Sequence, residues 1–168
     1  MQYFILSASI SSFILGFFGV SWEDVDEKIE DEFPAVEFIS VDALQTQFQS
    51  NPGQLPLIID VREADEFAVS HLAEARNVLT GIEISKLVQD KTSPIVVYCS
   101  VGYRSAAVAA ELEALGYTSV RNLRHSLFEW ADKGLPMENL QGQTSLVHPY
   151  NRAWGSLVKE QLHSYTPE

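Results

Sequence analysis

The chain has 168 residues, 46% of them hydrophobic, and a formal net charge of −12. This length and composition fit one globular domain with its own core, and the acidic balance argues against nucleic acid as a partner, since phosphate binding requires clustered Lys and Arg. A single cysteine excludes an internal disulfide framework and a cysteine-rich zinc site, and the four histidines lie far apart without ligand spacing, so we expect no metal and no cofactor.

Residues 1–20 contain no charged side chain. A helix of 20 residues spans about 30 Å, roughly one hydrocarbon core. We therefore predict that residues 1–21 are a transmembrane anchor, which fits the length and the lack of charge, or a signal peptide, although the usual positive n-region is missing. A buried core helix is the third interpretation, but no polar face exists to meet water. We expect the protein to be membrane-anchored or exported, with its domain on the non-cytoplasmic side.

An acidic amphipathic linker helix is predicted over residues 22–34. Apolar residues recur there at spacings of three and four: Trp22, Val25, Ile29 and Phe33. Seven acidic residues and one lysine occupy this segment. Because an acidic face would be repelled by anionic lipid, we expect the apolar stripe to pack on the domain that follows.

A domain is predicted over residues 35–140, where short apolar runs alternate with amphipathic segments. The predicted strands cover residues 36–39, 57–61, 95–98 and 119–123. The predicted helices cover residues 41–49, 63–69, 85–89, 102–115 and 126–133, with Ser40 as an N-cap and Gly116 as a left-handed C-cap. This alternation indicates a three-layer α/β fold with a central parallel sheet flanked by helices. Sites in such sheets form at the carboxyl ends of the strands, where Asp60 and Cys99 lie.

The only cysteine lies at the junction of a predicted strand and a predicted helix, in the segment Tyr98-Cys99-Ser100-Val101-Gly102-Tyr103-Arg104-Ser105. A thiol there would face unpaired backbone N–H groups and the positive end of a helix, which favours the thiolate. The Cys-x4-Arg spacing makes a short loop whose amides are expected to converge on the sulfur, and Gly102 supplies the backbone freedom that such a loop needs. An inert, buried cysteine is the alternative interpretation.

Three stretches of this chain follow one another in the order of a known family pattern. They are Ile58-Ile59-Asp60-Val61-Arg62-Glu63 with Glu66-Phe67, His71-Leu72, Ala75 and Asn77-Val78; Ile95-Val96-Val97-Tyr98-Cys99 with Gly102 and Arg104-Ser105; and Leu115-Gly116-Tyr117 with Val120, Trp130 and Gly134-Leu135-Pro136. On these motifs, residues 36–136 resemble a single-domain rhodanese, a member of the persulfide-forming sulfurtransferases.

The resemblance implies a sulfurtransferase in which Cys99 is the nucleophile. Cys99 would take a sulfane sulfur from a donor, thiosulfate or a persulfide, and pass it as a persulfide to a thiol or cyanide. The resemblance also implies that Arg104 shapes the loop and holds an anionic donor. Five further residues would bind substrate: Ser100, Val101, Gly102, Tyr103 and Ser105. Tyr103 departs from more basic loops and leaves Arg104 as the loop's only positive charge, which argues against a strong preference for thiosulfate.

Asp60, Arg62 and His71 are expected to support the site structurally. We expect the Asp60 carboxylate to accept loop N–H bonds, Arg62 to pair with Glu66 four residues later, and His71 to make a structural hydrogen bond. The partners implied are a small sulfur donor and a thiol acceptor, with a protein sulfur acceptor as an alternative, and the membrane through the N-terminal segment.

Residues 141–168 are predicted to be a C-terminal extension that packs on the domain. Their segment from Val147 to Gly155 looks like the tail of some bacterial and plastid rhodanese-like proteins. Tyr150, Trp154, Leu157 and Val158 recur at helical spacings, and His148 could approach the active site.

Two other functions fit parts of the sequence. A phosphatase or arsenate reductase of the Cys-x5-Arg kind has one more residue in its loop, which makes room for a tetrahedral oxyanion that the present spacing lacks. A non-catalytic sulfur carrier or binding module at a membrane would load Cys99 but turn over slowly; the N-terminal segment favours this interpretation and the intact loop opposes it.

Overall fold

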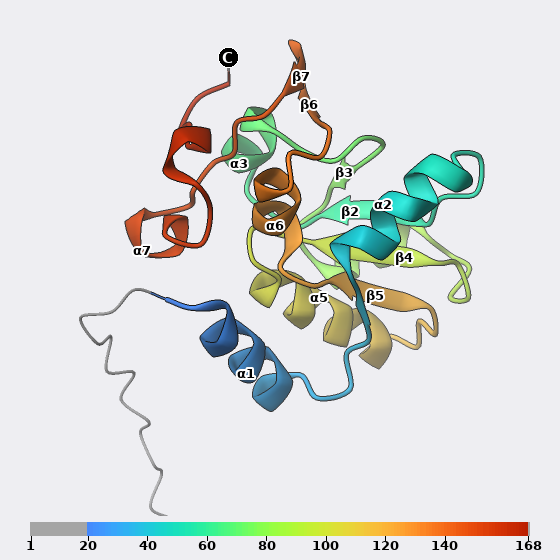
Figure 1. Cartoon of the computed structure of the whole chain (residues 1–168). Helices are drawn as coiled ribbons and strands as arrows, with labels where there is room; N and C mark the ends of the chain where they lie inside the picture. Colours follow the sequence, from blue (N-terminus) through green and yellow to red (C-terminus); the bar gives the residue numbers. More distant parts are fainter. Residues whose placement is uncertain (1–19, 168) are drawn as a thin grey trace, which may run out of the picture.

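The computed structural model describes residues 20–167. Its elements, in chain order (Figure 1), are α1 (Trp22–Glu32), β1 (Phe38–Ile39), α2 (Val41–Ser50), β2 (Leu57–Asp60), α3 (Ala64–Val69), β3 (Arg76–Asn77), α4 (Gly81–Leu87), β4 (Ile95–Tyr98), α5 (Tyr103–Ala114), β5 (Val120–Leu123), α6 (Ser126–Asp132), β6 (Met137–Asn139), β7 (Gly142–Thr144), α7 (Arg152–Gly155) and the 3-10 helix η1 (Glu160–Leu162).

Five strands form a parallel sheet in the order β1-β5-β4-β2-β3, with helices on both faces (Figure 1). The register between β2 and β4 pairs Asp60 with Tyr98, so the chain after each of these strands leaves the sheet at the same edge. The predicted three-layer α/β fold with a central parallel sheet is confirmed. The edge strand β3 and the β6–β7 hairpin were not expected, because strands of two or three residues carry too short an apolar run to stand out in the sequence.

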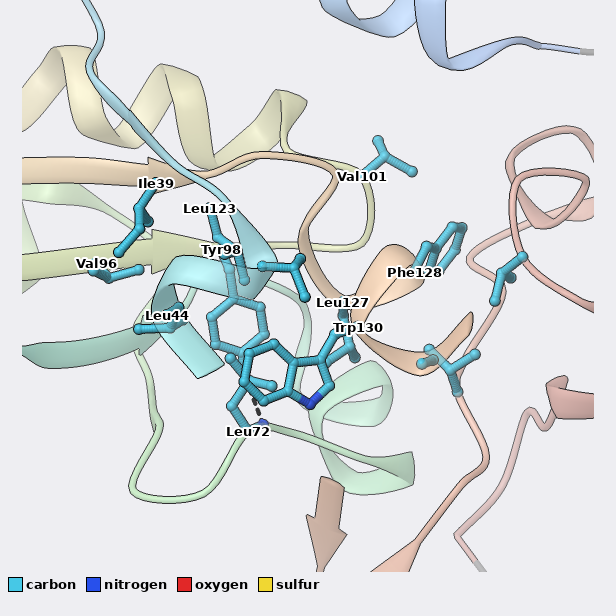
Figure 2. Packing of buried hydrophobic residues seen from close by; sticks show 14 of the residues in the cluster. Ile39, Leu44, Leu72, Val96, Tyr98, Val101, Leu123, Leu127, Phe128 and Trp130 are labelled. Carbon is cyan, nitrogen blue, oxygen red and sulfur yellow. Dashed lines mark hydrogen bonds between the residues drawn. The ribbon is translucent and has the colours of Figure 1, made fainter. Parts of the chain in front are cut away.

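Side chains of β4 alternate between two apolar layers. Tyr98 belongs to the layer that contains α2 and α6, and Figure 2 shows its ring beside Leu72, whose N–H donates to the Tyr98 hydroxyl at 3.1 Å. Val97 and Cys99 belong to the opposite layer, with α4 and α5. All four residues of β4 are buried, as expected for the central strand of a covered parallel sheet. The Cys99 sulfur therefore lies on the α5 side of the sheet. Its position is fixed by a strand that cannot shift without disturbing both layers.

Local signals located most helix ends correctly. The Ser40 hydroxyl accepts a hydrogen bond from the Ala43 N–H at 3.2 Å, as its predicted N-cap role requires. Gly116 has φ +89° and ends α5 in the predicted left-handed conformation. The helix predicted over residues 85–89 begins earlier, at Gly81, because the Thr80 hydroxyl caps it by accepting the Glu83 N–H.

Helix α1 packs its apolar stripe on the domain, as predicted. Val25 and Ile29 are each 2% exposed and join the first apolar layer. Polar contacts fix the helix from its other side: the Arg124 guanidinium donates to the Asp26 carboxylate at 2.6 Å, and the Tyr103 hydroxyl donates to Glu32 at 2.5 Å. Helix α1 is thus tied both to the loop after β5 and to the first residue of α5.

The chain after β7 folds back over the domain. Val147, Leu157 and Val158 are buried in the first apolar layer, and the Lys159 N–H donates to the Asp132 carboxylate of α6 at 2.9 Å. This return places α7 beside the carboxyl end of the sheet (Figure 1). The extension therefore reaches the edge at which Cys99 lies.

The predicted membrane segment, residues 1–21, falls mostly on residues 1–19, which lie outside the described residues. Among residues 20–167, no helix has the length and apolar character that a membrane crossing requires. Membrane attachment and a non-cytoplasmic location stay predictions of the sequence.

Candidate active site

Cys99 is the first residue after β4, and its side chain is held by the loop that follows it. The sulfur accepts a hydrogen bond from the Gly102 N–H at 3.2 Å, and the Ser105 hydroxyl oxygen lies 3.5 Å from it. Gly102 has φ +105°, a left-handed conformation that strains any residue with a Cβ and that turns the chain into α5. Of the expected ring of amides, that of Gly102 is hydrogen-bonded to the sulfur in the described structure.

Backbone N–H groups in the first turn of α6 hold the start of this loop. The Leu127 N–H donates to the Cys99 carbonyl at 3.2 Å, and the Phe128 N–H donates to the Ser100 carbonyl at 3.0 Å. The Ser126 hydroxyl accepts the Cys99 N–H at 3.2 Å. Ser126 is fully buried and meets Cys99 only because the fold brings together residues that are 27 positions apart, so no signal in the sequence pointed to it.

Asn122 of β5 holds the other end of the loop. Its amide donates to the Gly102 carbonyl at 2.8 Å, and its oxygen accepts the Ser105 hydroxyl at 2.7 Å. Asn122 is 0% exposed, so each of these groups would be costly to leave unpaired. Asparagine is uncommon inside strands, and its place in the predicted strand 119–123 was the sequence signal that could have revealed it.

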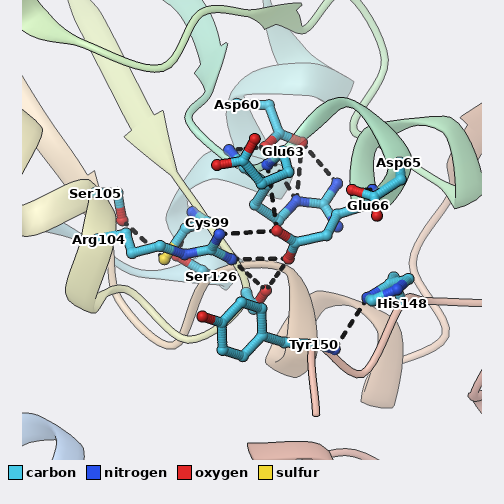
Figure 3. A network of polar contacts seen from close by, with 12 residues as sticks. Asp60, Glu63, Asp65, Glu66, Cys99, Arg104, Ser105, Ser126, His148 and Tyr150 are labelled. Carbon is cyan, nitrogen blue, oxygen red and sulfur yellow. Dashed lines mark hydrogen bonds and ion pairs between the residues drawn. The ribbon is translucent and has the colours of Figure 1, made fainter. Parts of the chain in front are cut away.

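Arg104 is bound by a carboxylate that the sequence did not assign to it. Its two terminal nitrogens each donate to a Glu66 oxygen at 2.8 Å, and one also donates to the Ser100 hydroxyl at 3.1 Å (Figure 3). Burial alone would lower the pKa of Arg104, but the Glu66 carboxylate and the charge of Cys99 outweigh it and raise that pKa above its ordinary value. The guanidinium is therefore a permanent charge beside the sulfur.

The ion pair with Arg104 lowers the pKa of Glu66, whereas it raises that of Arg104. Burial alone would raise the pKa of its carboxyl, but the hydrogen bonds and charge of Arg104, with the charge of Arg62, hold that pKa below its usual range. Glu66 is 2% exposed and also accepts the Ser100 hydroxyl at 3.1 Å. It is thus an ionised carboxylate in the wall of the loop.

The predicted pairing of Arg62 with Glu66 is wrong. The Arg62 guanidinium donates instead to the Asp60 carboxylate at 2.6 Å and to the Ser70 carbonyl at 2.6 Å, with both charged side chains fully buried. Arg62 precedes the extended N-cap Glu63 and is not helical, so the four-residue helix spacing does not apply. Asp60 also accepts the Arg62 N–H at 2.9 Å, in line with the expected backbone role.

His71 lies outside the sulfur pocket and makes structural contacts. Its Nδ1 lies 3.0 Å from the Phe67 carbonyl oxygen, and its ring stacks on that of Phe67 with centroids 3.8 Å apart. Its backbone pairs with Glu138 of β6. These contacts link α3 to the hairpin.

A pocket of about 250 Å³ opens over the sulfur. Seven residues line it: Cys99, Ser100, Val101, Tyr103, Arg104, Tyr150 and Trp154. The first five come from the predicted loop, while Tyr150 and Trp154 come from the C-terminal extension, where the sequence predicted packing on the domain but no place in the site. Cys99 is only 1% exposed, so a reactant must enter this pocket to reach it.

His148, for which the sequence left open an approach to the active site, instead holds the backbone of Tyr150. The Tyr150 N–H donates to His148 Nδ1 at 3.0 Å (Figure 3), and His148 is absent from the pocket lining. A second hollow, of about 1290 Å³, runs between the start of α1 and the extension, where Trp22 and His163 line it without any cysteine. Within residues 20–167, no group of three or more His, Cys, Asp or Glu side chains could hold a metal ion.

Comparison with known proteins assigns the family. A model of the rhodanese-like domain matches residues 40–133, more than half of the chain, and the chain therefore belongs to the rhodanese-like domain family. A sulfurtransferase of Allochromatium vinosum is 34% identical over 89 residues, which cover 51% of this chain and 81% of that protein. Thiosulfate sulfurtransferase GlpE of Actinobacillus succinogenes is 32% identical over 88 residues, which cover 51% of this chain and 78% of that protein.

A solved structure shares the fold. Thiosulfate sulfurtransferase from Pseudomonas aeruginosa superposes with a TM-score of 0.59 at 20% identity, over 70% of this chain and 23% of that one. The family and these relatives support a sulfurtransferase-type role. The matched residues include the whole Cys99 loop and end before Tyr150.

Proposed function

We propose that this protein transfers sulfane sulfur through a persulfide on Cys99. The observation that carries the proposal is the position of the Cys99 sulfur, which lies at the base of a pocket and accepts a hydrogen bond from the Gly102 N–H. This donor stabilises negative charge on sulfur, whether it is the thiolate or the persulfide. The 12-residue helix α5 begins at this loop and directs its positive end toward the same point.

The reaction has two half-steps. In the first, the Cys99 thiolate attacks the outer sulfur of a donor; a new S–S bond forms, the donor's own S–S bond breaks, and its electron pair leaves with the donor remnant, sulfite from thiosulfate or a thiolate from a persulfide. In the second, an acceptor thiolate or cyanide attacks the outer sulfur of the Cys99 persulfide and releases the Cys99 thiolate. Sulfur and charge balance in each half-step, and no general base is required.

A sulfur carrier that loads and releases slowly is the second candidate. It is favoured by the 1% exposure of Cys99, since a sulfur that is closed in by Tyr150 and Trp154 exchanges with a bulky acceptor slowly. Turnover separates the two: an enzyme releases many equivalents of product for each protein molecule, and a carrier releases one.

Intact-protein mass spectrometry of the full chain tests the proposal. Incubation with thiosulfate or a small persulfide is expected to add one sulfur atom that cyanide then removes, and Cys99→Ser is expected to gain none. Cys99 is the only cysteine, so the added atom needs no further localisation. A wild-type protein that gains no sulfur from any donor would overturn the proposed function. Serine differs from cysteine by one atom, so a melting curve equal to that of the wild type serves as the folding control.

A further inference from the structure

The pocket over Cys99 is completed by residues that lie outside the matched family domain. Tyr150 and Trp154 belong to residues 141–168, whereas the match ends at residue 133. The Arg104 guanidinium carbon lies 4.8 Å from the centre of the Tyr150 ring, so this ring covers the charged face of the arginine (Figure 3). We call Tyr150 and Trp154 the aromatic wall.

The backbone holds the aromatic wall in a set position. Tyr150 has φ +64°, a left-handed conformation that is unfavourable for a tyrosine and persists only where the surroundings impose it. Its N–H is fixed by His148 Nδ1 at 3.0 Å. The Trp154 N–H is fixed by the Asn151 side-chain oxygen at 3.1 Å. Two separate side chains thus fix the backbone from which each ring projects.

The electrostatics of the pocket disfavour a doubly charged anion. Arg104 is the only cationic side chain that lines the pocket in the described part of the chain, and the Glu66 carboxylate already binds it in two places. With Cys99 as a thiolate, the site holds two negative charges, one on Glu66 and one on the sulfur, against the single positive charge of Arg104. Thiosulfate would bring two further negative charges into this site.

Resting on the proposed function, we propose that the aromatic wall selects the sulfur donor: a small persulfide whose body is apolar and uncharged, R–S–SH, in preference to thiosulfate. The body R packs against Tyr150 and Trp154, and the outer sulfur reaches Cys99. The Cys99 thiolate attacks that sulfur, the S–S bond of the donor breaks, and the products are the Cys99 persulfide and the thiolate R–S⁻. A pocket of about 250 Å³ admits a body of roughly the size of one aromatic ring.

Matched donors test this selection on the full chain. The probes are benzyl persulfide, 4-carboxybenzyl persulfide and thiosulfate. The second probe has the same reacting persulfide group as the first and one additional charge on its ring. The readout is the initial rate of sulfur addition to the protein, measured by intact mass. The wild type is expected to load about tenfold faster from benzyl persulfide than from its carboxylated analogue. Tyr150→Ala and Trp154→Ala are each expected to slow loading from benzyl persulfide about tenfold and to change loading from thiosulfate less than twofold.

Two further variants separate charge from packing. Glu66→Gln removes the negative charge beside Arg104 and is expected to raise the rates with the carboxylated probe and with thiosulfate. Leu140→Ala truncates a side chain that is 93% exposed, away from the pocket, and is expected to change no rate. If Trp154→Ala does not fold, Trp154→Leu and the two benzyl probes on the wild type decide the question.

Distinct results overturn distinct claims. Equal wild-type rates for the two benzyl probes, or a uniform slowing of all donors in the wall variants, would overturn selection by the aromatic wall and leave the Cys99 persulfide in place. Loading from none of the three donors in the wild type would overturn the proposed function, and the selection with it.

Discussion

The pocket over Cys99 has a floor and a wall that are built in different ways. The floor is the loop from Cys99 to Ser105, and its polar groups are bonded to Asn122 and Ser126, which are both 0% exposed. The aromatic wall is peripheral: Tyr150 is 46% exposed and lies over the Arg104 guanidinium. The floor thus shares the stability of the core, whereas the wall can vary without disturbing the fold. In the proposed function, the floor carries the chemistry and the aromatic wall carries the selection of the donor.

The largest effect on stability is expected beneath the floor, in the buried Asp60–Arg62 pair. Asp60→Ala leaves the Arg62 charge fully buried without its carboxylate, and such a loss costs about 3–5 kcal/mol. Chemical denaturation measures it as the difference in the free energy of unfolding. The matched control is Asp42→Ala, because the Asp42 side chain is 77% exposed and its pairing with Lys133 is a surface contact that contributes about 0–1 kcal/mol. Equal losses of unfolding free energy in the two variants would contradict the claim that the floor shares the stability of the core.

A smaller effect is expected at the boundary between floor and wall, where Glu66 binds Arg104. Glu66→Gln is expected to lower the free energy of unfolding by about 1–2 kcal/mol at neutral pH, because one partner of a largely buried charged pair becomes neutral.

This contribution has a defined dependence on pH. Because folding lowers the pKa of the Glu66 carboxyl, its stabilisation is fully present above the unfolded value of about 4.3 and is lost as the pH falls through the lower folded value. Denaturation of the wild type below about pH 4.3 should therefore show a steeper loss of stability than denaturation of Glu66→Gln. Parallel pH profiles would contradict the assignment of this carboxylate to the Arg104 pair.

The smallest effect on stability is expected in the wall. Tyr150→Ala removes a half-exposed ring, and alanine keeps the left-handed backbone strain that tyrosine already has. The free energy of unfolding should therefore stay within about 1 kcal/mol of the wild type. Tyr150→Gly keeps the same truncation and suits the positive φ, so it should be at least as stable as Tyr150→Ala. Thermal or chemical denaturation of the two variants measures the difference. A loss comparable to that of Asp60→Ala would show that the wall is part of the core.

Much of the floor was predictable from the sequence, because its geometry is local. The strand β4, the loop of Cys99 and the start of α5 follow one another within a dozen residues, and Gly102 signals the turn between strand and helix. The same applies to the caps at Ser40 and Gly116. The prediction for Arg62 was wrong because it applied a helix spacing to a residue that lies just before the helix.

The sequence by itself determined the parallel α/β fold, the position of Cys99 at a strand's carboxyl end, and the apolar stripe of α1, since apolar periodicity and short-range turns act within a few residues. Only the tertiary structure decided that Glu66 pairs with Arg104, that Asn122 and Ser126 hold the loop, and that Tyr150 and Trp154 close the pocket. These contacts join residues that are 17 to 46 positions apart in the chain. Which distant side chains meet depends on how the layers pack, and packing is a property of the whole chain rather than of any one segment.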